Sequence, residues 1–180
     1  MAQVKIQIKS IFGEVLFEYE KEHNTIKDTV EEAVRQKASL YRANLDGASL
    51  DGASLYRASL NGASLYRAKN IPYIPLNCPS DGAFVGWKKV DGKLVQLLIP
   101  EDVKRSSATT MKCRCDKAKV LAITSLDGTE QYDSVLNTNY TDTEYKVGEM
   151  VYPDKFDDDR WNECSSGIHF FINKQDAINY

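Results

Sequence analysis

Residues 38–67 consist of six tandem five-residue repeats, and this period restricts the fold of the chain more than any other feature. Alanine occupies the first position and leucine the third position of every repeat. Five residues advance a helix by roughly 500°, which would spread the leucines around its circumference. The period of a plain strand is two. Three of the repeats end in Asp-Gly or Asn-Gly, and such pairs favour turns. The segment is therefore expected to be neither a helix nor a plain strand, but a regular succession of turns.

The repeats resemble the pentapeptide-repeat family, whose motif is a small residue two places before a central Leu or Phe. The resemblance covers 30 residues. It implies a short right-handed quadrilateral β-solenoid, with four repeats or about 20 residues per turn and with Leu and Ala pointing inward. Six repeats make only about one and a half turns, fewer than such a fold needs alone. Something must therefore cover both of its open ends.

The segment before the repeats, residues 1–37, is expected to be a β-hairpin followed by a helix. Hydrophobic and polar residues alternate from Val4 to Lys9, which is the period of a half-buried strand, and a turn around Gly13 leads to a second run of β-formers. Thr25 and Asp28 have the spacing of a capping box, and the apolar residues after Thr25 lie on one helical face. This helix, over residues 25–36, is the candidate cap for the first open end. Residues 71–75 are expected to lead the chain out of the coil at the other end, because their two prolines would break ladder bonding.

Residues 71–180 are expected to form a third part, a β-rich α+β domain, after a repeat segment that spans 38–70. Asp91-Gly92 between two apolar runs predicts a hairpin over residues 84–99. Further strands are expected over residues 120–124, 145–152 and 166–172, and Asn173 is expected to cap a short terminal helix. The whole chain is thus predicted to be α+β and mainly β.

The third part resembles a C-terminal domain that follows pentapeptide repeats in phage and prophage proteins, through residues 86–89, 97–100, 112–115 and 164–171. The resemblance implies a viral origin and action inside the cytoplasm of a bacterial host cell. The N-terminus lacks the apolar block of a signal peptide, and no apolar run is long enough to span a membrane. The leading hypothesis is a non-catalytic binding protein, a phage-encoded accessory that engages a host protein.

The alternative hypothesis is a C-terminal domain that binds or sequesters a nucleotide. The sequence from Gly167 to Phe170, followed by Ala177 and Tyr180, resembles the strand and helix that help line the nicotinamide pocket of ADP-ribosyltransferases. No motif for the catalytic glutamate follows, so the domain could bind a nucleotide without chemistry; an ADP-ribosyltransferase-like domain that modifies one is the other form of this hypothesis. It predicts a pocket that contains His169. The candidate ligand-binding residues are Trp87, His169, Phe170 and Tyr180.

Three Tyr-Arg pairs on the outer positions of the repeats are the candidate partner surface, because Tyr and Arg are frequent at interface hot spots. The alternative is that outer positions are permissive and that the pairs arose by duplication. The residues are Tyr41, Arg42, Tyr56, Arg57, Tyr66 and Arg67. An open solenoid edge can also pair with another copy, so a homodimer is predicted.

Direct nucleic-acid binding is not expected, because the net charge is −3 and no segment is strongly basic. A DNA-mimic inhibitor of a host enzyme is a third, weaker hypothesis. One and a half turns would span about 7 Å, or about two base pairs. The repeats also carry three Arg against two Asp, whereas a mimic should be acidic.

The four cysteines are expected to be free thiols in a reduced protein, and no cofactor or metal is predicted. Zinc takes four nitrogen or sulfur ligands, and the alternative set is Cys113, Cys115, Cys164 and His169. Their spacing does not follow a zinc pattern. A Cys164 nucleophile with His169 as its base is a further alternative that nothing in the spacing fixes.

Overall fold

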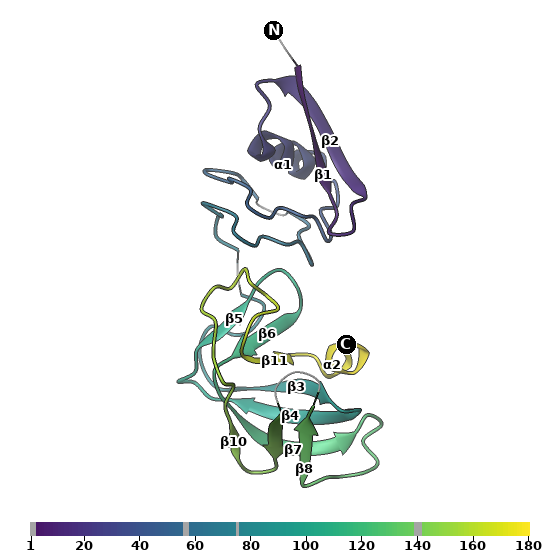
Figure 1. Ribbon diagram of the computed structural model, residues 1–180, viewed down its shortest axis with the longest axis vertical. Coiled ribbons are helices and arrows are strands. Elements are labelled where there is room, and N and C mark those ends of the chain that lie inside the picture. The colour runs from purple at the N-terminus through teal and green to yellow at the C-terminus, as the bar shows by residue number, and fades with distance from the viewer. Residues whose placement is uncertain (1–2, 56–57, 75, 139–141) are drawn as a thin grey trace. The chain divides into compact units, whose positions relative to one another are not determined.

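The computed structural model describes residues 3–55, 58–74, 76–138 and 142–180. The chain divides into two compact units, Met1–Pro75 and Leu76–Tyr180. The first unit contains a hairpin, a helix and the repeats, and the second contains most of the strands (Figure 1). Strands outnumber helices and the named sheets are antiparallel, so the prediction of an α+β, mainly β chain is confirmed.

The predicted hairpin and helix of the first unit are both present. Strands β1 (Gln3–Lys9) and β2 (Val15–Glu22) pair antiparallel around a turn in which Gly13 has a φ of +89°. Helix α1 (Ile26–Arg35) begins at Thr25, whose hydroxyl accepts a hydrogen bond from the Asp28 amide while the Asp28 side chain accepts one from the Thr25 amide. The capping box that the sequence predicts is therefore confirmed.

Helix α1 ends without a glycine, through two hydrogen bonds that turn the chain directly into the repeats. Lys37 has a φ of +57°, a left-handed conformation that glycine usually supplies at this position. Its amide donates to the carbonyl of Val34 at 3.0 Å, and the Ala38 amide donates to the carbonyl of Ala33 at 2.9 Å. This pair of bonds is the Schellman arrangement, which satisfies two of the last carbonyls of the helix.

Residues twenty positions apart pair in parallel along the repeats. The bridges are Ser39↔Ser59, Asn44↔Ser64 and Ser49↔Lys69. The leucine side chains between them lie inside. Five of the six are buried, and Leu55 is partly buried: the buried ones are Leu40, Leu45, Leu50, Leu60 and Leu65. The last residue of the repeat adopts a left-handed conformation whether it is Gly or Arg, as at Gly47, Gly52, Gly62, Arg42 and Arg67.

The first four repeats form hydrogen bonds both with α1 and with the segment at the end of β1. The carbonyl of Lys9 accepts from the Asn44 amide at 2.7 Å, and the Ile11 amide donates to the carbonyl of Arg42 at 2.8 Å. The carboxylate of Glu31 on α1 accepts from the Ser54 amide at 2.8 Å. The sequence predicted only the helix as a cover for the first open end, and the end of the hairpin shares that role.

The second unit is built on a seven-stranded antiparallel sheet in the order β10-β7-β4-β3-β11-β6-β5, beside a separate β8-β9 pair (Figure 1). Strand β11, near the end of the chain, lies between β3 and β6, so the centre of the sheet is closed by residues far apart in sequence. The strands are β3 (Phe84–Val90), β4 (Lys93–Ile99), β5 (Arg105–Ser107), β6 (Lys112–Cys115), β7 (Ala118–Ser125), β8 (Ser134–Asn137), β9 (Thr143–Lys146), β10 (Met150–Val151) and β11 (Ile168–Phe171), and the helix is α2 (Lys174–Asn179).

Most of the strands predicted in this unit, and its terminal helix, are present. The β3–β4 hairpin turns at Asp91 and Gly92, whose φ values of +44° and +70° suit a two-residue turn with both central residues left-handed. Asn173 caps α2 as predicted. The single strand expected over residues 145–152 is wrong, because a turn at Gly148, with a φ of +87°, divides it into the end of β9 and β10.

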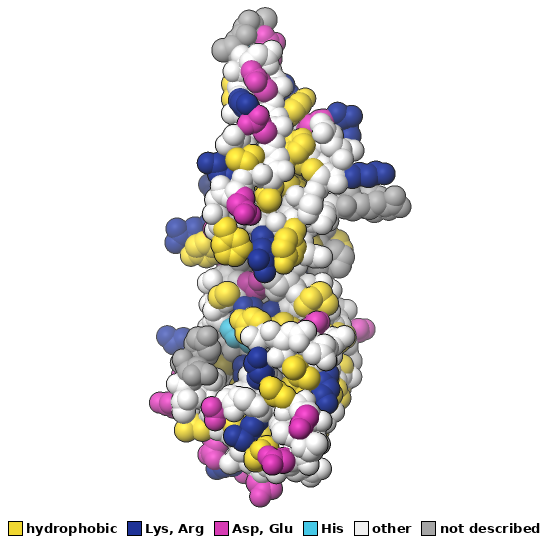
Figure 2. Space-filling model, turned by 90° about the vertical axis from the view of Figure 1, so that its right-hand side faces the viewer, with side chains coloured by type: hydrophobic (Ala, Val, Ile, Leu, Met, Phe, Trp, Pro, Cys, Tyr) yellow, Lys and Arg dark blue, Asp and Glu magenta, His cyan; other side chains and the backbone are white. Residues whose placement is uncertain are grey.

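Acidic and basic side chains are mixed over the face shown in Figure 2, so neither sign dominates it. None of the described helices is long and apolar enough to cross a membrane.

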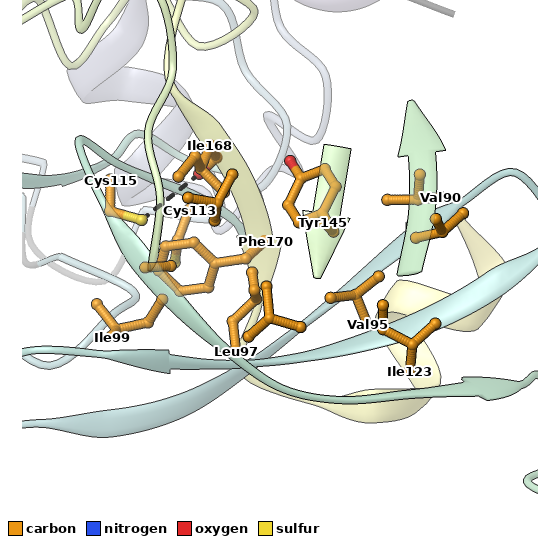
Figure 3. Close-up of a cluster of buried hydrophobic side chains, with 14 of the residues drawn as sticks. Val90, Val95, Leu97, Ile99, Cys113, Cys115, Ile123, Tyr145, Ile168 and Phe170 are labelled. Carbon is orange, nitrogen blue, oxygen red and sulfur yellow. Dashed lines mark hydrogen bonds between the residues drawn. The ribbon is translucent and has the colours of Figure 1, made fainter. Parts of the chain in front are cut away.

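The core of the second unit lies against one face of its sheet (Figure 3). Phe170 of β11 is fully buried there, and its ring lies 5.9 Å from that of Phe84. Gly86 of β3 faces Phe170, and a Cβ at this glycine would stand only 2.6 Å from the ring. Cys113 and Cys115 from β6 share this core. The ring of Phe170 therefore occupies the space that the missing Gly86 side chain leaves.

Candidate functional site

The second unit contains a pocket of about 570 Å³. Residues of β3, β6, β9 and β11 line it, together with the connection from β10 to β11 and the terminal Tyr180. His169 is among the lining residues, as the nucleotide-binding hypothesis predicts.

The pairing of β3 with β11 explains why one edge of the pocket lies between these strands. Their recorded register contains one pair, Trp87↔Phe171. Beyond this pair, the side chain of Lys88 rather than a backbone amide reaches the neighbouring strand, and its Nζ donates to the carbonyl of His169 at 3.3 Å. The side chain of Lys88 therefore bridges the two strands where no further residue pair is recorded, and it lines the pocket.

Four lysines line the pocket, Lys88, Lys89, Lys112 and Lys155, together with one acidic residue, Asp154. Lys112 is only 7% exposed, and its Nζ lies 3.4 Å from the sulfur of Cys164. The Nζ of Lys89 donates to the carbonyl of Ile178 at 2.9 Å. None of the four forms an ion pair with a carboxylate among the residues that the structure describes. An enclosed cation without an ion-pair partner is costly, so the buried Lys112 and the half-buried Lys88 favour an anion in the pocket.

The two most enclosed lysines have opposite pKa shifts. Burial is the main cause that lowers the pKa of Lys88 to about 8; Cys115 acts to raise it, and the positive charge of Lys112 adds a smaller lowering effect. Burial also acts to lower the pKa of Lys112, but Cys164 and Tyr180 outweigh it, and the pKa of Lys112 is raised. Near pH 7 Lys112 is thus a firmly charged group, while Lys88 holds its proton weakly.

His169 is neutral in this environment. Burial lowers its pKa to about 4, helped by the charges of Lys112, Lys88 and Arg114, while a backbone hydrogen bond with Glu163 acts in the opposite direction. Its Nε2 is buried without a hydrogen-bond partner among the described residues. A neutral imidazole with an unused nitrogen can accept or donate a hydrogen bond, depending on its tautomer.

Aromatic side chains supply the apolar part of the pocket lining. Tyr145 and Phe171 are both buried, and Tyr180 lies beside Phe171 with the ring centroids 5.1 Å apart. Burial raises the pKa of the Tyr145 hydroxyl well above its usual range, so this hydroxyl stays protonated. A pocket with aromatic walls and a few cationic groups suits an anion that also carries a ring or another apolar body.

The connection from β10 to β11 is held in place by a buried arginine. Arg114 of β6 is 2% exposed and donates to the carbonyls of Asp159 and Ser166, both at 2.8 Å. The carboxylate of Glu163 accepts from the Thr110 amide at 3.1 Å. These bonds fix the wall that contributes Cys164, Ser165 and Ser166 to the pocket.

The predicted ligand-binding residues are only partly brought together. His169 and Tyr180 line the pocket, whereas Phe170 lies in the core on the other side of β11 and Trp87 packs with Leu94 and Phe171. The sequence analysis missed Lys88 and Lys112. Lys88 lies in β3 and Lys112 in β6, among buried apolar residues. A lysine inside such an apolar strand was the feature of the sequence that could have identified them.

The cysteines do not assemble a site with His169. Cys113 and Cys115 are fully buried and Cys164 is exposed. Among the described residues, no group of three or more His, Cys, Asp or Glu side chains is arranged to hold a metal ion. Cys113 instead interacts with Cys78, and this hydrogen bond is the main cause that lowers the pKa of Cys78 to about 7.

The Tyr-Arg pairs of the repeats form stacked contacts. The guanidinium of Arg42 lies 4.9 Å from the centroid of the Tyr41 ring and 5.4 Å from that of Phe12. Arg67 lies 4.9 Å from the centroid of Tyr66. The third pair, Tyr56 and Arg57, lies outside the described residues. Phe12 is 68% exposed, so it adds to the surface around the first pair.

Comparison with known proteins gives two family matches. A family of unknown function (DUF5758) matches residues 74–177, and pentapeptide repeats match residues 37–69. No curated protein and no solved structure matches the chain.

Proposed function

The chain belongs to the family of unknown function DUF5758, and we propose that the unit Leu76–Tyr180 is a non-catalytic binding domain for a small anionic ligand of the nucleotide class. One observation carries the proposal: Lys88 and Lys112 line a pocket of about 570 Å³ without a carboxylate partner among the described residues. Aromatic residues beside them support a ligand with both an anionic group and a ring.

The test is direct binding to a panel of nucleotides that includes NAD and cyclic dinucleotides, by calorimetry and thermal shift. A ligand at one hundred times its Kd stabilises the fold by about 2.7 kcal/mol. Lys112→Met removes a charged hydrogen-bond donor worth about 1.5–3 kcal/mol, so the Kd should rise by roughly 10- to 100-fold. Lys119→Met is the matched control, because Lys119 is exposed on β7 and does not line the pocket.

The proposal is contradicted if no member of the panel binds, or if Lys119→Met weakens binding as much as Lys112→Met. His169→Ala adds a second readout, since the neutral imidazole should contact the ligand through a hydrogen bond rather than a charge. Its effect on Kd should therefore be smaller than that of Lys112→Met and should not change between pH 6 and pH 8.

For the repeats, we propose a short right-handed quadrilateral β-solenoid that serves as a scaffold or association element. Parallel bridges between residues twenty apart support four repeats per turn. Exposed Tyr41 and Arg42 are the proposed contact surface for a protein partner. Because strand edges associate unless they are blocked, we expect a dimer. A monomer in light scattering at tens of micromolar would contradict this part.

The proposed setting is a phage-encoded accessory protein that acts on a host component in the bacterial cytoplasm. It rests on the sequence resemblance alone. A pull-down from a bacterial lysate, compared with a Tyr41→Ala, Arg42→Ala double variant, tests it. Specific capture that the double variant loses is the expected result, and capture unaffected by the variant refutes the assigned surface. The DNA-mimic alternative predicts that duplex DNA competes for the captured protein.

A further inference from the structure

Lys88 lines the pocket, and its amine has one recorded hydrogen bond to the protein. Its Nζ contacts the carbonyl of His169 at 3.3 Å, and no carboxylate pairs with it among the described residues. The amine belongs to a strand whose neighbour, β11, is bonded to it at one residue pair only. It is therefore a primary amine with one weak protein contact, facing a space large enough for a small molecule.

We propose that Lys88 holds carbonyl-bearing anions covalently, as an imine between its Nζ and an aldehyde or ketone carbon of the ligand. This inference rests on the proposed binding of an anion in the same pocket. It adds a bond type that non-covalent binding does not require, and it extends the ligands of the pocket to small anions that carry an aldehyde or ketone.

The reaction needs only groups that are present in the pocket and the ligand. The lone pair of the neutral Lys88 amine forms a bond to the carbonyl carbon, and the carbonyl oxygen becomes the hydroxyl of a carbinolamine. The carbon–oxygen bond then breaks, and the oxygen leaves as water with the two hydrogens that the nitrogen gives up. The product is one C=N bond and one water molecule, with no change in oxidation state, so no oxidant or reductant takes part.

The environment makes the neutral amine available near pH 7. With a pKa of about 8 instead of 10.5, the neutral fraction at pH 7 is about 300-fold larger than for an ordinary lysine. A less basic amine is also a weaker nucleophile, so the gain in rate is smaller than the gain in population. Desolvated lysines beside another cation are the usual Schiff-base lysines of proteins.

Lys112 is suited to the other half of the ligand. Cys164 and Tyr180 keep the pKa of Lys112 raised, so it remains a cation and a poor nucleophile. Its 7% exposure means that an anionic group bound to it loses most competing water. Lys88 therefore binds the carbonyl carbon of the ligand, and Lys112 binds its anionic group.

The experiment uses the full chain with pyridoxal 5′-phosphate, an aldehyde that carries a phosphate, followed by borohydride reduction and peptide mapping. Reduction converts the imine into a stable secondary amine, and hydride from the borohydride supplies the two electrons. At pH 7 we expect Lys88 to be modified at least tenfold faster than the exposed Lys119. Lys88→Arg, which keeps the charge, should abolish the adduct at this position, and near-ultraviolet circular dichroism checks that the variant folds.

Two further experiments distinguish imine formation at Lys88 from non-covalent binding of an anion. Lys112→Met should slow the phosphorylated aldehyde at least tenfold and leave pyridoxal, which lacks the phosphate, nearly unchanged. Pyridoxine 5′-phosphate, which has an alcohol in place of the aldehyde, measures binding without covalent chemistry. If this alcohol binds but Lys88 is modified no faster than Lys119, the imine is refuted and the anion site stands. If Lys88 reacts equally fast with both aldehydes, the imine stands and the anion site is refuted.

Discussion

Replacing Gly86 by alanine tests the packing that places β11 in the centre of the sheet. A Cβ at this position would stand 2.6 Å from Cδ2, 3.3 Å from Cε2 and 3.4 Å from Cγ of Phe170. Real Cβ atoms essentially never come within 3.0 Å of another heavy atom, so something must move. The φ of Gly86 is not positive, so the expected cost comes from space and not from backbone strain.

The ring of Phe170 has little room to retreat. It is fully buried, the ring of Phe84 lies 5.9 Å away, and Leu97 of β4 pairs with Gly86 across the hairpin. Overpacking of this kind costs about 1–3 kcal/mol. For a domain of about 100 residues each kcal/mol lowers Tm by roughly 4–8 °C, so Gly86→Ala should lower the Tm of this unit by about 5–20 °C.

The assay is thermal unfolding followed by near-ultraviolet circular dichroism, together with urea titration. Phe170→Leu removes Cε2 and the rest of the outer ring and leaves two Cδ methyl groups that can rotate away from the new methyl group; on its own it should destabilise the unit by leaving a cavity. The Gly86→Ala, Phe170→Leu double variant should be more stable than the sum of the single effects predicts, by about 1 kcal/mol or more. Strict additivity, or a Gly86→Ala Tm within 2 °C of the parent protein, would refute the packing argument.

Three other substitutions test the remaining parts of the fold. Thr25→Ala removes the helix cap and should cost about 1 kcal/mol in urea unfolding, whereas Thr25→Ser should cost little. Hydrogen bonds from Lys21 and Thr25 lower the pKa of Asp28 to about 2. The stability that the Asp28 carboxylate contributes should therefore be lost as the pH falls from about 4 toward 2. Leu45→Ala should cost about 2–5 kcal/mol because Leu45 is fully buried in the repeats, and an equal cost for the exposed Tyr41→Ala would contradict the inward orientation of the leucines. Because burial lowers the pKa of His169 from 6.5 to about 4, the unfolded chain takes up this proton first, and stability should fall between pH 6.5 and pH 4 by about 2–3 kcal/mol; His169→Gln should remove that part of the pH dependence.

Elements that depend on neighbouring residues could be predicted from the sequence. The capping box at Thr25, the turn at Asp91-Gly92 and the N-cap at Asn173 each need only a few consecutive residues to act. The five-residue spacing of the leucines predicts which side chains of the repeats lie inside. A register shifted by one position would bury polar residues in place of the leucines. The strand over residues 145–152 was predicted as one because its residue types suit a strand throughout, and the turn at Gly148 depends on contacts with other strands.

The order of the central strands could not be predicted. Strand β11 follows β3 by about eighty residues and still lies beside it, and this pairing depends on the fit between Phe170 and Gly86. No local pattern encodes that fit. The pocket depends on the same arrangement, so His169 and Tyr180 were found from a resemblance, while Lys88 and Lys112 were not found at all.

The short β3–β11 register also accounts for the chemistry of the site. Beside the single pair Trp87↔Phe171, the side chain of Lys88 reaches the carbonyl of His169 on β11. The strands leave a lysine amine in a place where its charge is unfavourable, as its lowered pKa shows. An anion beside this amine restores the lost solvation, and an imine removes the need for the charge. In both cases binding removes the cost of holding this charge away from water, so ligand affinity and the stability of the sheet centre are expected to change together.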